Sequence, residues 1–344
     1  MKHTANTLYV TQPKSFLSKE GNTILVQQDG NKVAQLPIHA VGEIVCFGFG
    51  IVVTAPLMEH CAENGITIAY LSESGRFLGR IEGPIKGNVL LRRQQYRLAD
   101  DPAASIEIAR TIVAAKVQNS RSNLTRFLRN YPGHAAMEKV AGASAWLARQ
   151  LDSVKRCSDI EALRGLEGDS ANSYFGVFDH LIIQQKDDFR FEGRNRRPPL
   201  DAVNALLSFA YTLLANDLRS ALESVGLDPY VGFLHRDRPG RPSLALDLME
   251  EFCASFVDRL VMNLINMKMV RPDQFVRQPT GEVQMDPEAR KTLLTSYQQR
   301  KRETLNHPFL EEEMEIGLIF LAQARLLARH IRGDIDYYPA FLWR

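Results

Sequence analysis

The stretch LLRRQQYRL, residues 90–98, marks the point where the chain changes from strand-like to helix-like sequence. Before it, short runs rich in β-branched and apolar residues are separated by turn signals such as DGN at residues 29–31. After it, apolar residues recur at helical spacing over long segments that contain few turn signals. The sequence therefore predicts an α+β protein with a small N-terminal β domain, residues 1–86, and a larger, all-α domain, residues 87–344.

Strands are predicted for the runs TILVQQ, KVAQLPI, GEIVCFG, ITIAYL and RFLGRIEG, and one helix is expected among them at residues 55–63. Beyond residue 98 the helical pattern continues to about residue 154. Further helices are predicted at residues 158–183, 199–224, 243–269, 286–302 and 309–332. Two linkers interrupt this pattern, and both are basic and Pro-rich: FEGRNRRPPLD at residues 191–201 and HRDRPGRP at residues 235–242.

The composition is that of a globular protein, with 45% hydrophobic and 24% charged residues in 344. No apolar run reaches the ~18 residues of a membrane span, and the start of the sequence lacks the pattern of a signal peptide. The four cysteines are widely spaced and form no CxxC pair. These features predict a cytoplasmic protein with reduced thiols rather than a disulfide framework or structural zinc.

The net charge of +2 hides local clusters of arginine. Such clusters are what phosphate backbones need, because each neutralised phosphate releases a condensed counterion. The alternative is that each cluster is only a solvated face. The candidate nucleic-acid contacts are Arg194, Arg196, Arg197, Arg236, Arg238 and Arg241.

The stretch GFLHRDRPGRPSLALDLMEEF, residues 232–252, places a histidine in the second linker, before a helix for which Ser243 is the expected N-cap. On that helix Asp247, Glu250 and Glu251 fall within one stripe. His235 precedes the stripe, across a loop that can fold back on the helix start. A histidine with carboxylates suits Mn²⁺, with Mg²⁺ accepted through oxygen ligands and water. The alternative is a basic loop followed by a solvated helix face.

A third ligand is expected from LRGLEGDSANSYF, residues 163–175. Glu167 there precedes Gly168 within a helical pattern. A glycine inside a helix costs about 1 kcal/mol relative to alanine, so it suggests close approach by another backbone or a ligand. The alternative is that Gly168 ends the helix and that Glu167 is exposed.

Together these motifs resemble the CRISPR-associated integrase family, the nuclease-like subunit of CRISPR adaptation. The resemblance covers nearly the whole chain, and the connectors look most like those of a type I system, subtype I-C. It rests on GNVLLRRQQY (87–96), LRGLEGDSANSYF (163–175), RNRRPPLDAVNALLSFAYTLL (194–214), GLDPYVGFLH (226–235) and SLALDLMEEF (243–252).

The resemblance implies a catalytic set of Glu167, His235, Asp247 and Glu250. Glu167, His235 and Glu250 would hold Mg²⁺ or Mn²⁺, while Asp247 is needed for activity without being a direct ligand. Glu251 is the neighbour that could be confused with Glu250. The N-terminal domain is expected to provide dimerisation and partner contacts, and the helical domain the metal site.

The implied activity is that of a DNA integrase and endonuclease that inserts captured fragments into a CRISPR array through 3′-hydroxyl attack. The implied partners are a second copy in a homodimer, a small ferredoxin-like subunit, double-stranded DNA with 3′ overhangs and CRISPR repeat DNA. An iron–sulfur nuclease that trims the duplex is a further candidate, and no membrane is involved. Two alternatives stay open: a non-catalytic nucleic-acid-binding assembly subunit, and a general metal-dependent nuclease.

Overall fold

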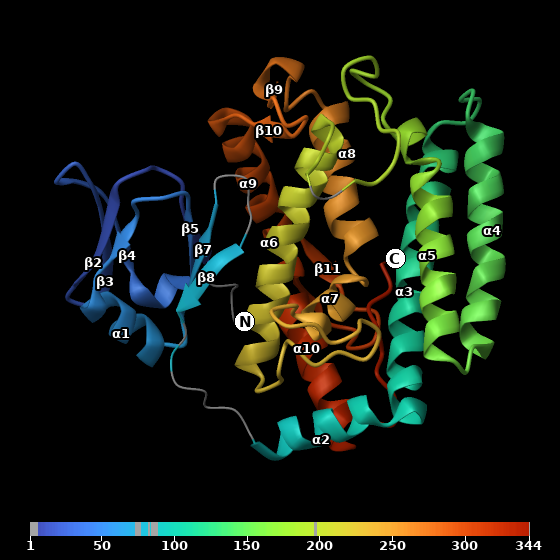
Figure 1. Ribbon diagram of the computed structural model, residues 1–344, viewed down its shortest axis with the longest axis horizontal. Coiled ribbons are helices and arrows are strands. Elements are labelled where there is room, and N and C mark those ends of the chain that lie inside the picture. Colours follow the sequence, from blue (N-terminus) through green and yellow to red (C-terminus); the bar gives the residue numbers. More distant parts are fainter. Residues whose placement is uncertain (1–5, 73–76, 82, 84–88, 196–197, 344) are drawn as a thin grey trace. The chain divides into compact units, whose positions relative to one another are not determined.

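A computed structural model describes the chain apart from residues 1–5, 73–76, 82, 84–88, 196–197 and 344 (Figure 1). The chain divides into two compact units, Met1–Gly87 and Asn88–Arg344. The first is built mainly of strands and the second mainly of helices, which confirms the predicted order of a β region followed by a larger helical region. In the described part of the chain, no helix is long and apolar enough to cross a membrane.

The described residues of the N-terminal unit form two four-stranded sheets. In one, β5 lies between β1 and β7 with all three strands parallel, and β8 pairs antiparallel with β7. In the other, β2, β3 and β4 pair antiparallel in sequence order, and β6 adds to β2 in parallel. The elements are β1 (Asn6–Val10), β2 (Ser15–Glu20), β3 (Thr23–Gln28), β4 (Asn31–Pro37), β5 (Val41–Phe47), β6 (Val52–Val53), α1 (Ala55–Glu63), β7 (Thr67–Leu71) and β8 (Phe77–Ile81).

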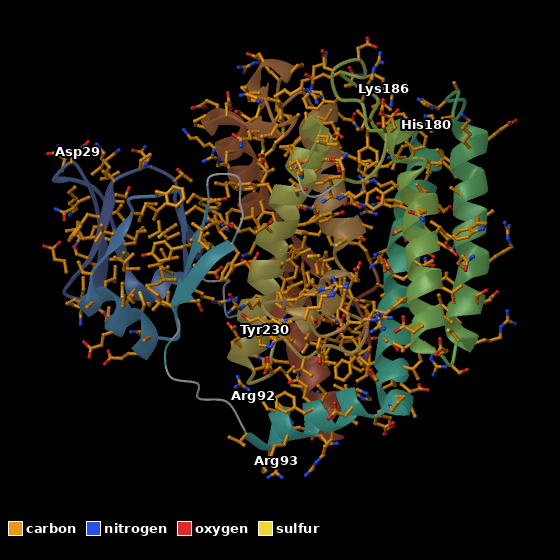
Figure 2. All side chains as sticks on the ribbon, viewed as in Figure 1. Asp29, Arg92, Arg93, His180, Lys186 and Tyr230 are labelled. Atoms are coloured by element: carbon orange, nitrogen blue, oxygen red, sulfur yellow. The ribbon has the colours of Figure 1, made fainter. Side chains whose placement is uncertain are left out.

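Alternation of side chains explains how these strands form one apolar core. In β3, Ile24 and Val26 are buried while their neighbours are more exposed, as expected for a strand with one face on the core. The turn from β3 to β4 needs two residues with positive φ, and Asp29 (labelled in Figure 2) and Gly30 supply φ values of 48° and 80°. The predicted strands correspond to β3, β4, β5, β7 and β8, whereas β1, β2 and β6 were not among them.

In the second unit α3, α4 and α5 pack side by side (Figure 1). This unit also carries two short antiparallel hairpins, so the predicted all-α domain needs that correction. The elements are α2 (Val89–Asp100), α3 (Pro102–Asn130), α4 (Met137–Arg156), α5 (Ile160–Phe175), α6 (Ala202–Ser224), α7 (Ser243–Met249), α8 (Arg259–Asn266), β9 (Phe275–Arg277), β10 (Val283–Met285), α9 (Pro287–Arg302), β11 (Thr304–Asn306), β12 (Glu313–Glu315) and α10 (Ile316–Arg332).

Aspartate residues set several of the helix starts. Helices α3, α5, α6 and α9 each follow an aspartate whose carboxylate accepts a hydrogen bond from a backbone N–H of the first turn. This contact satisfies one of the amide groups that have no partner within the helix. The four capping residues are Asp101, Asp159, Asp201 and Asp286.

The helix predicted at residues 243–269 is interrupted. Helix α7 ends at Met249, and a π-helical segment, Cys253–Asp258, precedes α8. Apolar periodicity alone did not show this break, because apolar residues continue through the segment. The helix predicted at residues 309–332 begins only at Ile316, since Glu313–Glu315 pair with β11 instead.

Gly168 lies inside α5, which continues to Phe175. A Cβ atom built on this glycine would meet no atom within 4 Å. The expected close approach by another backbone is therefore wrong, and so is the alternative that Gly168 ends the helix.

A buried polar network joins α5, α6 and the π-helical segment. Asp258 is 1% exposed and accepts hydrogen bonds from the hydroxyls of Tyr211 and Tyr174. The Tyr174 hydroxyl in turn accepts from Asn123 of α3. Burial raises the pKa of Asp258 to about 7, although both tyrosine hydroxyls oppose the rise.

This burial predicts a pH-dependent stability that the Asp258→Asn variant lacks. The pKa of this carboxyl is about 7 in the folded protein and 3.8 in its ordinary, unfolded setting. Between these two pH values the folded state therefore binds more protons than the unfolded state. The wild type should therefore lose stability as the pH rises through this window, on the order of 2–4 kcal/mol relative to Asp258→Asn. Urea unfolding of both proteins at about pH 4 and pH 8 measures the change, and a difference in stability that stays constant contradicts it.

Candidate functional site

The carboxylate of Asp247 on α7 organises the loop that precedes it. Asp247 is completely buried. Its Oδ2 accepts from the backbone N–H groups of Phe233 (2.6 Å) and Leu234 (3.0 Å), and its Oδ1 accepts from that of His235 (2.9 Å). The loop thus folds back onto α7, as the sequence predicted.

This fold-back requires glycine at position 232. A Cβ atom there would lie 2.7 Å from Oδ2 of Asp247 and 2.9 Å from the carbonyl carbon of Ser243. Neither group can yield easily, because one is a buried carboxylate and the other is backbone. Ser243 itself is the first residue of α7, with Pro242 at the cap position, so the predicted N-cap is wrong. The Ser243 hydroxyl donates instead to the carbonyl of Arg236 (3.1 Å).

The ring of His235 is held between two carboxylates. Its Nδ1 lies 2.7 Å from Oδ1 of Asp247, and its Nε2 lies 3.9 Å from Oε1 of Glu250. A carboxylate beside Nδ1 favours the tautomer that carries the proton there. The lone pair of Nε2 is then available on the side where Glu250 lies.

Lys116 of α3 links Glu167, the third predicted ligand, to Glu250. Its ammonium contacts Oε1 of Glu167 on α5 and lies 2.7 Å from Oε2 of Glu250. Burial lowers the pKa of Lys116, but Glu250 and Glu167 outweigh that effect, so its pKa is raised and the group stays charged. The structure therefore gathers Glu167, His235 and Glu250, with Asp247 behind the imidazole.

The sequence patterns did not predict a role for Lys116. The available signal was a single lysine in the apolar run TIVAAKVQN, because lysine is rarely buried on a helix unless it is paired. Among the residues that the structure describes, no three His, Cys, Asp or Glu side chains are grouped as a ready metal site. Glu167 and Glu250 instead contact the Lys116 ammonium, and Glu250 also faces the His235 ring.

Glu250 and Glu251 point to different surroundings. Glu250 faces Lys116 and His235. The carboxylate of Glu251 is completely buried and accepts from Gln323 (2.8 Å), from the Tyr338 hydroxyl and from the backbone N–H of Phe341 (2.7 Å). The geometry thus separates the two neighbours and assigns Glu250 to the site.

Two residues of the motif at 87–96 bind the loop that precedes His235. Gln95 of α2 is fully buried and donates to the carbonyls of Asp228 and Val231, both at 2.8 Å, while accepting from the Asp228 N–H. Arg92 donates to the carbonyl of Gly226. Figure 2 labels Arg92 and also Tyr230, which belongs to the same loop as Gly226. These contacts join α2 to residues 226–231, which lead into His235.

Helix α5 is also tied to the loop. Arg164, one turn before Glu167, donates from Nε to the carbonyl of Leu234 (2.6 Å). By contrast, His180 and Lys186 lie at the opposite end of the helical unit from Arg92 and Tyr230 (Figure 2). The charged groups that act on His180 are Lys186, Lys139, Asp179 and His134, none of which belongs to this cluster.

The candidate nucleic-acid arginines have different surroundings. Arg236 follows His235, pairs with Glu161 and has 61% of its side chain exposed, and Arg238 is exposed in the same loop. Arg241 is partly buried. Arg194 donates to Asn204 and Ser208 and lies 5.1 Å from the centre of the Tyr211 ring, so it stabilises α6. Arg196 and Arg197 lie outside the described residues.

Comparison with known sequences places this arrangement in a family. Residues 8–299 match the family model described as CRISPR associated protein Cas1. The chain is 51% identical over 344 residues to CRISPR-associated endonuclease Cas1 1 of Chlorobaculum tepidum, with all of both chains covered. It is 48% identical to CRISPR-associated endonuclease Cas1 2 of Rhodospirillum rubrum, again with all of both covered. It is also 36% identical to a Cas4/Cas1 fusion of Geobacter sulfurreducens, covering 98% of this chain and 60% of the fusion.

Solved structures share the fold. The Cas1 protein TM1797 of Thermotoga maritima matches with a TM-score of 0.81 and 25% identity, covering 95% of this chain and 97% of that one. A casposase bound to integration product matches with a TM-score of 0.85 and 21% identity, covering 98% of this chain and 94% of that one. A chain of a Cas6-RT-Cas1–Cas2 complex matches with a TM-score of 0.82 and 20% identity, covering 100% of this chain and 37% of that one. The family resemblance seen in the sequence motifs is confirmed, while the subtype stays a prediction, and the chain belongs to the Cas1 family of CRISPR-associated proteins.

Proposed function

We propose that this chain is a divalent-metal-dependent DNA endonuclease and integrase of CRISPR adaptation. The observation that carries the proposal is that Glu167 and Glu250, from separate helices, both contact Lys116, while Glu250 also lies 3.9 Å from the ring of His235. The endonuclease names of the relatives and the likeness of fold to a casposase bound to integration product support it. A scaffold protein has no evident use for such a cluster.

The donor set fits Mg²⁺ or Mn²⁺. Two carboxylates and one imidazole nitrogen are ligands that Mn²⁺ accepts, and Mg²⁺ accepts the oxygen ligands together with water. We assign the three ligand positions to Glu167, His235 and Glu250. A bound ion would polarise the scissile phosphate and stabilise the charge on the attacking and leaving oxygens.

The protein's own residues orient this site and supply charge. Asp247 keeps the proton of His235 on Nδ1 and fixes the ring. Lys116 lies against Glu167 and Glu250 and offsets part of their negative charge. The exposed loop that carries Arg236 and Arg238 begins directly after His235, where it can contact the phosphates of the strand being cut.

The proposed reaction is a phosphodiester exchange. The 3′-hydroxyl of a captured fragment attacks a phosphorus of the array strand, a new P–O bond forms, and the old bond breaks to leave a free 3′-hydroxyl on that strand. The proton of the attacking hydroxyl passes to solvent, and the leaving oxygen gains one. Water in place of the hydroxyl converts the same step into endonuclease cleavage.

The proposed partners are those implied by the family. A second copy and a small ferredoxin-like subunit would contact the N-terminal unit, while double-stranded DNA with 3′ overhangs and CRISPR repeat DNA would reach the helical unit. The structure named as a Cas6-RT-Cas1–Cas2 complex supports a protein partner. The exonuclease Cas4/endonuclease Cas1 fusion of G. sulfurreducens supports a nuclease as an additional partner, for which we propose the iron–sulfur nuclease.

Removing any of the three proposed ligands should abolish DNA strand transfer. Glu167→Ala, His235→Ala and Glu250→Ala each remove one donor, and we expect at least a ~100-fold loss, or about 2.7 kcal/mol of transition-state stabilisation. A strand-transfer assay with Mn²⁺ on a duplex carrying 3′ overhangs measures the loss. Glu138→Ala, at an exposed position in the first turn of α4, is the control and should keep wild-type activity. Near-wild-type activity in two of the three variants rejects the assignment.

Asp247→Asn should harm both stability and activity, although it nearly preserves shape. The new amide NH₂ group must face two of the N–H donors that now approach a carboxylate. We expect a loss of about 2–4 kcal/mol in the free energy of unfolding and a 10–100-fold loss in strand transfer. Urea unfolding and the transfer assay measure the two effects. An unchanged unfolding midpoint argues against the buried carboxylate as the organiser of the loop.

Lys116→Met should make the site depend more strongly on added metal. Without the ammonium, Glu167 and Glu250 repel each other, which lowers the melting temperature in metal-free buffer. Mn²⁺ binding to the folded protein should then raise the melting temperature more in the variant than in the wild type. Differential scanning fluorimetry with and without Mn²⁺ compares the two shifts. A smaller shift in the variant shows that Lys116 does not take the place of the ion.

A further inference from the structure

The backbone that carries Glu250 is not held by regular α-helical bonds. Helix α7 ends at Met249. The N–H groups of Glu250, Glu251 and Phe252 donate three residues back, at 3.2, 3.3 and 2.9 Å. A π-helical segment begins at Cys253. Such irregular turns are frequent at functional sites, and they leave fewer local restraints on the residues they contain.

Contacts from a distant segment supply the missing restraint. The residues that follow Glu250 bind residues 338–343, which run beside α3 (Figure 1). Glu251 accepts from the Tyr338 hydroxyl and from the backbone N–H of Phe341. The Phe252 ring stacks on the Phe341 ring with centroids 5.3 Å apart and planes inclined by 17°.

Asn119 connects this segment to the helix that carries Lys116. Its Nδ2 donates to the carbonyls of Glu251 (2.8 Å) and Phe341 (2.9 Å), and its Oδ1 accepts from the N–H of Trp343 (2.9 Å). Asn119 is completely buried and lies three residues after Lys116 on α3. One side chain therefore fixes the site helix, the backbone next to Glu250 and the C-terminal segment together.

We propose that residues 338–343 are a positioning element for the metal ligand Glu250, acting through Glu251 as the main positioning residue. This inference rests on the proposed metal site. Glu251 touches neither substrate nor ion; it holds the backbone at Glu250 so that the carboxylate keeps its place opposite His235 and Glu167. Loosening that backbone lowers metal affinity, because part of the binding energy is then spent on ordering the ligand.

The test is Mn²⁺ binding, followed by the loss of the free-ion electron paramagnetic resonance signal. Glu251→Ala removes the acceptor, and Tyr338→Phe removes one donor to it; we expect the Mn²⁺ dissociation constant to rise at least ~10-fold in the first and less in the second. Glu251→Gln keeps one oxygen to accept from Gln323 and the Phe341 N–H, and its NH₂ group can donate to the Tyr338 hydroxyl, so it should stay within about 3-fold of wild type. The matched control is Tyr337→Phe, whose side chain is 61% exposed beside Phe309 and outside these contacts.

All titrations are made at a temperature where circular dichroism shows each variant folded, so that a purely structural role leaves the dissociation constant unchanged. If Glu251→Ala does not fold, Tyr338→Phe against Tyr337→Phe carries the comparison. Wild-type affinity in Glu251→Ala and Tyr338→Phe, together with lost binding in Glu250→Ala, overturns the positioning role and leaves the metal site standing. Absence of Mn²⁺ binding in the wild type overturns the metal site and this inference with it.

Discussion

The buried carboxylate of Asp247 is the constraint on which the rest of the site depends. A charge removed from water must find partners, and an unpaired one costs several kcal/mol. Asp247 finds them in three consecutive backbone N–H groups and one imidazole, all from the loop just before its helix. The same demand fixes glycine at position 232, the direction of the loop and the orientation of His235. The hydrogen bonds to the Asp247 carboxylate thus determine the position of His235, which the sequence places in a basic linker.

Lys116 balances the charges of Glu167 and Glu250 in the site. Glu167 and Glu250 come from different helices and would repel each other in a poorly solvated place. Lys116 lies against both and makes their proximity favourable without a bound ion. The helical unit therefore folds with its acidic residues already close together. An incoming divalent ion would replace or share a positive charge, rather than assemble the ligands from separate positions.

The sequence predicted the order of the two units and most of the strands described in the N-terminal unit. These predictions rest on local periodicity, whereas the proposed set of Glu167, His235 and Glu250 rests on short motifs and the resemblance to a family. The sequence did not predict Lys116 or Asn119, because their roles depend on which face of α3 meets α5 and α7. The break after Met249 was missed for a related reason: the partner that holds the turn, Phe341, is far away in the chain. Tertiary pairing of this kind leaves no periodic trace.

The distance along the chain between Glu251 and its partners has a consequence during synthesis. Tyr338 follows Glu251 by 87 residues. At about 5–20 residues per second a ribosome needs several seconds to add that stretch. During this interval the growing chain contains every acidic and imidazole group of the cluster but lacks the contacts that bury Glu251. The backbone at Glu250 therefore reaches its final form only after translation has passed residue 341.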